Sequence, residues 1–474
     1  MNSHASTTAG APPSLDLSRL IEAQKPGRFI AGLLLVCALM MLTEGYDLGA
    51  MSFAAPSLAR EWQLNRGAFG PVFGAFVIGT AIGAIVLGHV GDAIGRKRTM
   101  VWCGIAVSLL TFATMWAQSV PHLIVLRLLA GIGVGGVLPN VMSYVTEFVP
   151  KRWRATSVTL VYTGYAIGTG AGGVVAAWLI PHFGWQSVFF IGGVGPLLGA
   201  LALWRLPESP RFLVLRKREP GTVARIAERL QPGLRVAPDT QFSMTDEPST
   251  HASTREIFTG RLRLVTPTLW LVYIANSMAL FFLISWLPML IESVGVAPER
   301  AALVSLVFSI GGTIGGLALM RFVDRHGALV ITVLPLVGFP LVAVMGVPMP
   351  ELALTAVAFA VGFCVVGTQF GLNAVAAMVY PTALRSKGVG AAIGVQKIGA
   401  FAGPVIAGAL LSAQLSVQQL FMFGAAPVFI VMLLSFALGR ACRRSGVDGS
   451  GSITADTPPT LAANRTPLPT NTTI

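Results

Sequence analysis

Charged residues are scarce in this sequence of 474 residues. Asp, Glu, Lys and Arg make up 11% of the chain, against roughly 25% in soluble proteins, whereas 54% of the residues are hydrophobic and the mean hydropathy is +0.72. This balance excludes an ordinary soluble domain and predicts an all-α polytopic membrane protein. The 33 Lys and Arg outnumber the 20 Asp and Glu, which gives a net charge of +13. They gather in short clusters between apolar runs, a pattern that orients membrane proteins and does not indicate nucleic-acid binding.

Residues that could support catalysis are also few. The chain has four cysteines and six histidines, and neither set shows the spacing of a metal site or a disulfide framework. It contains no Walker-type loop and no nucleophile elbow, so ATP is not expected to drive it. We therefore predict a protein that is not an enzyme and that needs no metal and no cofactor. Residues 1–28 lack an apolar run, so we expect no cleavable signal peptide and a first span that acts as an uncleaved insertion signal.

Twelve apolar segments are long enough to cross a hydrocarbon core of about 30 Å. They cover approximately residues 29–52, 68–90, 99–119, 121–145, 155–180, 186–206, 267–292, 299–322, 328–347, 351–378, 387–412 and 418–440. Basic clusters lie in alternate loops on one side, which predicts that both termini are cytoplasmic. The expected division is a cytoplasmic tail at 1–28, a first six-helix bundle at 29–206, a cytoplasmic loop with short amphipathic helices at 207–266, a second six-helix bundle at 267–440 and a disordered cytoplasmic tail at 441–474.

The two groups of six spans repeat the same motifs. GHVGDAIGRKR follows the second span and MRFVDRHGALV the eighth, while PKRWR follows the fourth span and PTALR the tenth. Asp92 lies 58 residues before Pro150, and Asp324 lies 57 residues before Pro381. Parallel repeats of this kind enclose a site near the middle of the membrane in secondary transporters. We therefore predict two six-helix pseudo-repeat bundles around a central cavity.

The motif after the second span resembles the one that the major facilitator superfamily carries between its second and third helices. Glycines there allow close helix approach, and an acid beside a basic cluster can form ion pairs that hold helix ends together. In the second copy Met320 and Ala328 replace a glycine and a basic residue, so we expect a differently built second gate. The alternative is a plain helix end with orienting charges. The resemblance assigns gating roles to Gly88, Asp92, Gly95, Arg96, Lys97, Glu147, Arg154, Asp324, Arg325 and Arg385.

A narrower resemblance is to the aromatic acid:proton symporters of this superfamily, over roughly residues 25–440. It rests on EGYD at 44–47 with APSL at 55–58 in the first span, and on KIG at 397–399 followed by GP at 403–404 in the eleventh. It implies import of an aromatic carboxylate of the benzoate, hydroxybenzoate or protocatechuate type by proton symport through alternating access. Short loops and the lack of a targeting segment predict a multi-pass protein of a bacterial inner membrane. A site within one chain predicts a monomer whose partners are the substrate, protons and the lipid bilayer.

The acids of the first span are candidate functional residues because a charge inside a bilayer is costly. Glu44 and Asp47 are three residues apart and share nearly one helix face. At about 1.5 Å per residue, Glu44 and Arg127 lie at similar depth and Lys397 lies near the midplane. We predict that Asp47 or Glu44 carries the proton, that Arg127 tunes this acid, and that Arg127 and Lys397 bind the substrate carboxylate. The alternatives are a purely structural Arg127–Glu44 ion pair and a lysine at a helix interface.

The ring of an aromatic substrate needs an apolar slot with a few hydrogen-bonding groups. Suitable residues in the spans are Tyr46, Asn276, Trp286, Gln369 and Asn373, with Tyr162, Tyr165 and Phe282 as further aromatic candidates. Gln369 and Asn373 are four residues apart and share a helix face, which makes them the better candidates. Each of these side chains, taken alone, is better explained by packing between helices.

Three other functions fit parts of the sequence. PESPRF at 207–212 and YPTALRSKGVG at 380–390 are also found in sugar porters, which leaves a proton symporter of a sugar or of another organic acid. The glycine-rich fifth span is common in efflux antiporters, but the ordered Gly-Pro pattern at its end is missing. A membrane sensor of aromatic acids would bind without transport, and no signalling domain in the sequence supports it. Import by symport is therefore the preferred prediction.

Overall fold

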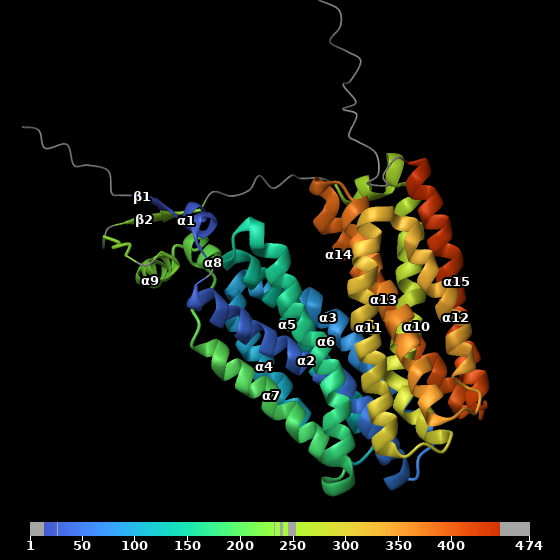
Figure 1. The fold of residues 1–474 in the computed structure, drawn as a ribbon. Helices are drawn as coiled ribbons and strands as arrows, with labels where there is room; N and C mark the ends of the chain where they lie inside the picture. The colour runs from blue at the N-terminus through green and yellow to red at the C-terminus, as the bar shows by residue number, and fades with distance from the viewer. Residues whose placement is uncertain (1–13, 26, 232, 238–239, 245–252, 446–474) are drawn as a thin grey trace, which may run out of the picture.

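The computed structural model describes residues 14–25, 27–231, 233–237, 240–244 and 253–445. In this part of the chain twelve bundle helices form two groups of six that lie side by side (Figure 1). The first half consists of α2 (Arg28–Glu61), α3 (Gly70–Ile94), α4 (Arg96–Thr114), α5 (Val120–Phe148), α6 (Lys151–Phe183) and α7 (Gln186–Trp204). The second half consists of α10 (Val265–Ser293), α11 (Pro298–His326), α12 (Val333–Val344), α13 (Glu351–Val379), α14 (Thr382–Ser412) and α15 (Val417–Arg444). The predicted all-α architecture of two six-helix bundles is confirmed.

Each predicted apolar segment corresponds to one bundle helix. Within the described residues, ten helices are long and apolar enough to cross a membrane. Of the other two bundle helices, α4 begins with the basic triplet RKR, and α12 is shortened by the preceding 3-10 helix η4 (Ala328–Thr332). The largest difference from the prediction is at α2, which continues beyond residue 52 to Glu61. Ala54, Ala55 and Leu58 are fully buried there, so protein packing extends the helix beyond its apolar stretch.

Short elements cover one end of the bundle, where the first and last described residues also lie (Figure 1). They are α1 (Leu17–Ala23), α8 (Pro210–Leu215), α9 (Pro220–Leu230), and the parallel strands β1 (Ser14–Asp16) and β2 (Gln241–Ser243). The 3-10 helices η2 (Thr254–Phe258) and η3 (Gly260–Leu262) precede α10, and η1 (Arg66–Phe69) precedes α3. We call this end the basic end, after the RKR and KRWR segments at 96–98 and 151–154, and the other the opposite end.

The central segment contains the amphipathic helix that the sequence predicts. Four apolar residues of α9 are buried, namely Val223, Ile226, Ala227 and Leu230, and their i, i+3, i+4, i+7 spacing gives one apolar face. This face contributes to the same core cluster as buried residues of α1 and α5. The strand pair, in which Ser14 is opposite Gln241, was not anticipated from the sequence. It ties the N-terminal segment to the central segment.

The helix packing repeats between the two halves. A Cβ atom added to Gly83 of α3 would lie 1.9 Å from the carbonyl oxygen of Ile132 in α5. A Cβ added to Gly315 of α11 would lie 2.2 Å from the carbonyl oxygen of Phe363 in α13. Small residues permit such close backbone approach in membrane helices. Because the two contacts are related by an offset of about 230 residues along the sequence, the pseudo-repeat seen in the motifs also governs the packing.

The two halves contact each other chiefly towards the opposite end. Helix α2 packs against α10, α3 against α14, and α6 against α11. Gly408 of α14 lies so close to Gly70 that an added Cβ would be 2.7 Å from the Cα of Gly70. Nearer the basic end of α14, Cβ atoms added to Gly390 and Gly394 would have no atom within 4 Å, and the ribbons of the two halves diverge there (Figure 1). The structure is therefore closed at the opposite end.

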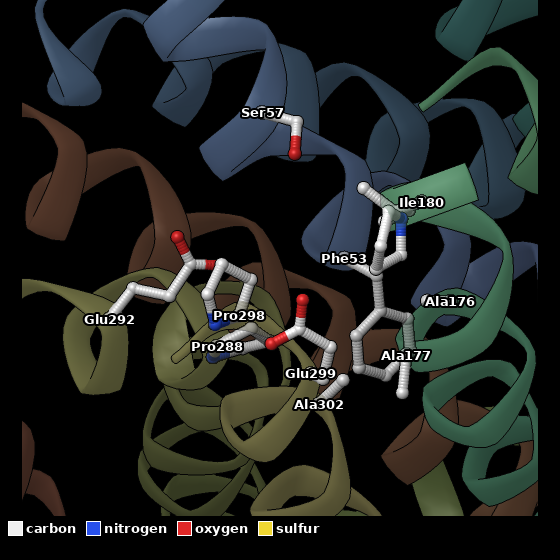
Figure 2. Close-up of a pocket in the computed structure, with 11 residues that line it drawn as sticks. Phe53, Ser57, Ala176, Ala177, Ile180, Pro288, Glu292, Pro298, Glu299 and Ala302 are labelled. Carbon is white, nitrogen blue, oxygen red and sulfur yellow. The ribbon is translucent and has the colours of Figure 1, made fainter. Parts of the chain in front are cut away.

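A small cavity lies in this contact between the halves. Figure 2 shows that it lies between α2 and α6 of the first half and α10 and α11 of the second. Phe53, Pro288 and Ala302 are among its lining residues. Its volume of about 10 Å³ suffices for about one water molecule, so an organic acid does not fit.

Candidate functional site

A buried ion pair joins α2 to α5 inside the first half. Arg127 Nη1 lies 3.1 Å from Asp47 Oδ1, and the two side chains are 1% and 0% exposed. The Thr111 hydroxyl donates to the same carboxylate oxygen at 3.3 Å, and Arg127 Nη2 donates to Thr114 Oγ1 at 2.9 Å. The Phe189 ring covers the guanidinium at 5.2 Å. The pair is thus held entirely by residues of the first half.

The ion-pair partner of Arg127 is therefore Asp47 and not Glu44, so the alternative of an Arg127–Glu44 pair is wrong. The sequence estimate placed Glu44 level with Arg127 by counting the rise along straight helices. It took no account of helix tilt or of the reach of an arginine side chain, which here spans to the acid one turn further along α2. Arg127 is also predicted to bind substrate, and in this conformation its guanidinium is enclosed within the first half.

Glu44 lies at the contact between the halves. Its side chain is buried, and Oε1 has no hydrogen-bond partner among the described residues. Lys397 of α14 interacts with it electrostatically, and the Lys397 ammonium donates to the Thr80 hydroxyl of α3 at 3.1 Å. The lysine of the second half therefore contacts a hydroxyl of the first half, and among the described residues it forms no ion pair with Glu44 at 4 Å or less.

A chain of amide side chains lies beside this lysine in the second half. Asn276 Nδ2 of α10 donates to Gln369 Oε1 of α13 at 3.0 Å. Gln369 Nε2 in turn donates to Gln396 Oε1 of α14 at 3.0 Å. The Tyr273 hydroxyl donates to Asn373 Oδ1 at 2.8 Å, one turn further along α13. The structure thus brings together the three predicted amide residues.

Sequence reasoning missed three residues of this arrangement. Gln396 is the neighbour of Lys397, and a glutamine inside an apolar span was the available signal. Tyr273 lies one helical turn from Asn276, so its position on the same face could have been found by spacing. Thr80 gave no signal, because threonine is common in membrane helices, where its hydroxyl bonds the preceding turn. Its hydroxyl also donates to the carbonyl oxygen of Val77 at 2.8 Å.

Two tyrosines of α6 form an aromatic surface near Glu44. The rings of Tyr162 and Tyr165 stack with centroids 5.5 Å apart and an interplanar angle of 24°. Both side chains are half-buried, and α6 passes directly beside the acid, because a Cβ added to the neighbouring Gly45 would lie 2.0 Å from the Tyr165 carbonyl oxygen. They therefore offer ring faces on the helix that packs beside the acid.

The other predicted aromatic residues take part in packing. The Tyr46 hydroxyl donates to the Val188 carbonyl of α7 at 2.9 Å, which fixes α2 to α7. Trp286 is fully buried, donates to the Pro404 carbonyl at 3.1 Å, and meets the Phe73 ring edge-on at 5.2 Å. Trp286 thus lies where α3, α10 and α14 meet. Phe282 packs edge-on against Phe421 within the second half.

The predicted gating motif forms a network at the basic end of the first half. Gly95 has φ 114°, which an L-residue with a side chain rarely adopts, and it makes the turn between α3 and α4. Arg96 pairs with Asp92, and its Nε lies 3.5 Å from Glu147 Oε1. The backbone N–H groups of residues 97 and 98 donate to the Glu208 carboxylate at 2.8 and 3.2 Å. An acid at a helix N-terminus is favourable, so Glu208 fastens the central segment to α4.

The remaining gating residues are placed as follows. Gly88 lies against Pro139, with an added Cβ 3.9 Å away, and Arg154 Nε donates to the Val149 carbonyl at 3.4 Å. Arg385 is exposed. The side chains of Asp324 and Arg325 lie outside the described residues. The gating roles of these residues stay predictions in both halves.

Comparisons with known proteins agree with this geometry. The family model described as Major Facilitator Superfamily matches residues 29–289 and 269–458. A gallate transporter of Pseudomonas putida is 37% identical over 417 residues, covering 87% of this chain and 92% of the relative. The 4-hydroxybenzoate transporter PcaK of Pseudomonas putida is 34% identical over 396 residues, covering 82% and 88%. A crystal structure of a bacterial homolog of the human lysosomal transporter Spinster has a TM-score of 0.70 at 18% identity, covering 89% of this chain and 99% of that one.

Proposed function

Because the chain belongs to the Major Facilitator Superfamily, we propose that it imports an aromatic carboxylic acid together with a proton by alternating access. It is a multi-pass membrane transporter of the bacterial inner membrane and not an enzyme. The relatives named for gallate and 4-hydroxybenzoate support the substrate class. The observation that carries the proposal is that the Lys397 ammonium of the second half donates to the Thr80 hydroxyl of the first at 3.1 Å, so one cation lies where the halves must separate.

Lys397 holds the substrate carboxylate in this proposal. A lysine ammonium binds a carboxylate as a point charge, and the stacked rings of Tyr162 and Tyr165 offer an aromatic face on α6, which packs beside Glu44. The amides of Gln369 and Gln396 bind ring hydroxyl groups, because an amide can both donate and accept a hydrogen bond. The substrate thereby joins the two halves.

Glu44 carries the proton in this proposal, and Arg127 holds the Asp47 side chain in place. The sequence left the choice between the two acids open. Asp47 forms an ion pair with Arg127 within the first half, whereas Glu44 forms no ion pair at 4 Å or less among the described residues. Each acid leaves one oxygen, Asp47 Oδ2 and Glu44 Oε1, without a hydrogen-bond partner there. Lys397 needs one anion beside it, which is either ionised Glu44 or the substrate. Protonation of Glu44 releases the ammonium for the substrate, so one proton enters with one carboxylate.

This charge balance predicts electroneutral transport. A proton and a monoanion carry no net charge, so only the pH difference drives uptake, with about tenfold accumulation per pH unit.

The conformation of the structure also fits this cycle. The distribution of basic residues indicates that the basic end lies in the cytoplasm. Because the opposite end is closed, the structure then represents a carrier that is open towards the cytoplasm. Loss of the inter-half contacts at that end then gives the outward-open state.

The test is uptake of labelled acids into proteoliposomes that contain the full chain, with empty liposomes to subtract passive entry. Benzoate, 4-hydroxybenzoate, protocatechuate and gallate form the panel, and a sugar is the control. We expect one or more aromatic acids to accumulate under a pH gradient, a protonophore to abolish this, and a membrane potential alone to have no effect. Accumulation of the sugar alone, or uptake that follows the membrane potential, would contradict the proposal.

A further inference from the structure

We propose that the basic end of the first half carries a binding site for an anionic phospholipid, separate from the transport site. The site is a pocket of about 290 Å³ between the start of α4, the end of α7 and α9. Five basic residues and two acids are among its lining residues, namely Lys97, Arg98, Arg205, Arg225, Arg229, Glu208 and Glu219. The lining therefore has an excess of positive charge.

The two acids of the pocket are already engaged. Both Glu208 oxygens accept backbone N–H groups at the start of α4. Glu219 Oε1 lies 3.4 Å from Arg98 Nη2, and Oε2 accepts from the Thr222 hydroxyl at 3.2 Å. Both of these partners belong to the pocket lining, so the acids link its walls to each other and leave part of the basic charge uncompensated.

Three arginines of the pocket remain without an acid. Within the described residues, Arg205, Arg225 and Arg229 form no ion pair at 4 Å or less. Arg225 donates to the Gly221 carbonyl at 3.3 Å and to a threonine hydroxyl at 3.0 Å, and Arg229 lies over the Phe29 ring at 5.6 Å. A guanidinium binds a phosphate in bidentate fashion, so a phosphate group is the anion that this pocket fits.

The surroundings of the pocket favour a lipid over a soluble phosphate. Helices α4 and α7 run antiparallel and pack closely, because a Cβ added to Gly104 of α4 would lie 3.1 Å from the Ala200 Cβ of α7. On these helices Trp102 and Trp204 are 63% and 61% exposed, and Leu201 is 52% exposed. Exposed tryptophans beside arginines mark the membrane interface. A phosphate in the pocket would thus have apolar helix surface directly below it for acyl chains, as in basic pockets that hold lipid headgroups.

The experiment is lipid binding to the purified full chain, measured by native mass spectrometry in detergent. The probe is phosphatidylglycerol, compared with phosphatidylcholine of the same acyl chains and with soluble glycerol phosphate. The variant is Arg205→Gln with Arg225→Gln. The matched control is Arg216→Gln with Arg218→Gln, which removes two exposed charges of the same central segment outside the pocket lining.

We expect phosphatidylglycerol to bind in preference to phosphatidylcholine, and the pocket variant to bind it about 25-fold more weakly, since each basic residue contributes about fivefold. The control variant should bind as the parent does, and an unchanged thermal unfolding profile in detergent should show that both variants fold. Equal loss in both variants would mean that general surface charge binds the lipid, and an unaffected pocket variant would place it elsewhere. Binding of glycerol phosphate as tight as that of the lipid would make this a soluble-anion site. Each of these three results would overturn the proposal.

Discussion

The two halves of the molecule share one fold but differ in the polar side chains inside their bundles. The first half buries Asp47 and Arg127 as an ion pair whose hydrogen-bond partners Thr111 and Thr114 belong to the same half. The second half holds neutral amides, Asn276, Gln369 and Gln396 among them, and its Lys397 finds partners only across the interface among the contacts described above. The two bundles thus share their packing, but the first contains a buried ion pair formed within itself and the second contains a lysine whose hydrogen bond crosses the interface.

This difference explains how a ligand can couple the halves. A cation that finds its anion across the interface has a different partner whenever the halves move or a ligand arrives, and a ligand shifts an equilibrium only through such differential contacts. A pair enclosed within one half moves as a unit and contributes the same energy in each state. In the proposed mechanism Lys397 and Glu44 are therefore the groups that respond to substrate, and the Asp47–Arg127 pair moves with the first half.

Breaking the enclosed pair should have the largest effect on the protein. Arg127→Met leaves Asp47 without its partner, and removal of one partner of a buried pair lowers the free energy of unfolding by about 3–5 kcal/mol. Adding Asp47→Leu removes the unpaired acid, and apolar replacement of both partners is often close to neutral. Thermal unfolding of the purified variants should show a large fall in Tm for the single variant and recovery in the double variant.

An exposed arginine gives the control for this measurement. Arg218→Met should change stability by no more than about 0.5 kcal/mol, because the side chain lies on the surface. A double variant that is no more stable than Arg127→Met would show that the pair is not self-contained. The contrast between the halves would then be lost.

Removing the exchangeable acid should abolish coupling while leaving the fold intact. Glu44→Gln mimics the protonated side chain, so substrate still binds Lys397 but no proton is required. We expect exchange of labelled for unlabelled substrate to continue, while the roughly tenfold accumulation per pH unit disappears. Glu44→Asp keeps a carboxylate and should retain accumulation. If Glu44→Gln still accumulates substrate, another acid carries the proton.

The sequence predicted the helices and half of the site for identifiable reasons. Twelve apolar runs specify twelve bundle helices because a membrane span needs its length in apolar residues. Gln369 and Asn373 were placed on one face because four residues make about one helical turn. Both do lie beside residues of α10, Asn276 and Tyr273, respectively.

The rest depends on how helices are arranged, which spacing along one helix does not determine. Counting residues could not decide whether Arg127 meets Glu44 or Asp47, because helix tilt and side-chain reach shift the contact by a turn. Gln396 contacts Gln369 from a separate helix. The sequence does not distinguish it from a glutamine that only forms hydrogen bonds between helices. The pairing of β1 with β2 joins segments far apart in the chain, and no local pattern predicts it.

The amide chain of the second half should affect recognition more than coupling. Gln369→Leu removes the central link between Asn276 and Gln396, and a hydrogen bond contributes about 1 kcal/mol. We expect the KM for 4-hydroxybenzoate to rise about fivefold to tenfold and the KM for benzoate, which has no ring hydroxyl, to stay unchanged. Gln418→Leu, an exposed glutamine of α15, is the control. An equal rise in KM for both acids would mean that the amides support the fold and do not bind the ring hydroxyl group.

The smallest effect is expected at the opposite end, where Arg60 of the first half pairs with Glu292 of the second. The arginine side chain is 54% exposed, so the pair contributes about 0.2–1 kcal/mol to this closed contact. Arg60→Gln should therefore shift the balance towards the state closed at the basic end by up to about fivefold.

Maleimide labelling of Gly394→Cys measures this shift, because residue 394 has open space around it and the native cysteines are buried. Labelling should slow by the same factor when Arg60→Gln is added. The matched control is Arg300→Gln, which breaks an exposed pair with Glu351 inside the second half and should leave the rate unchanged. Equal slowing by both changes would mean that the effect comes from surface charge in general. Slowing by Arg60→Gln alone would show that contacts between the halves, and not contacts within them, set the conformational balance.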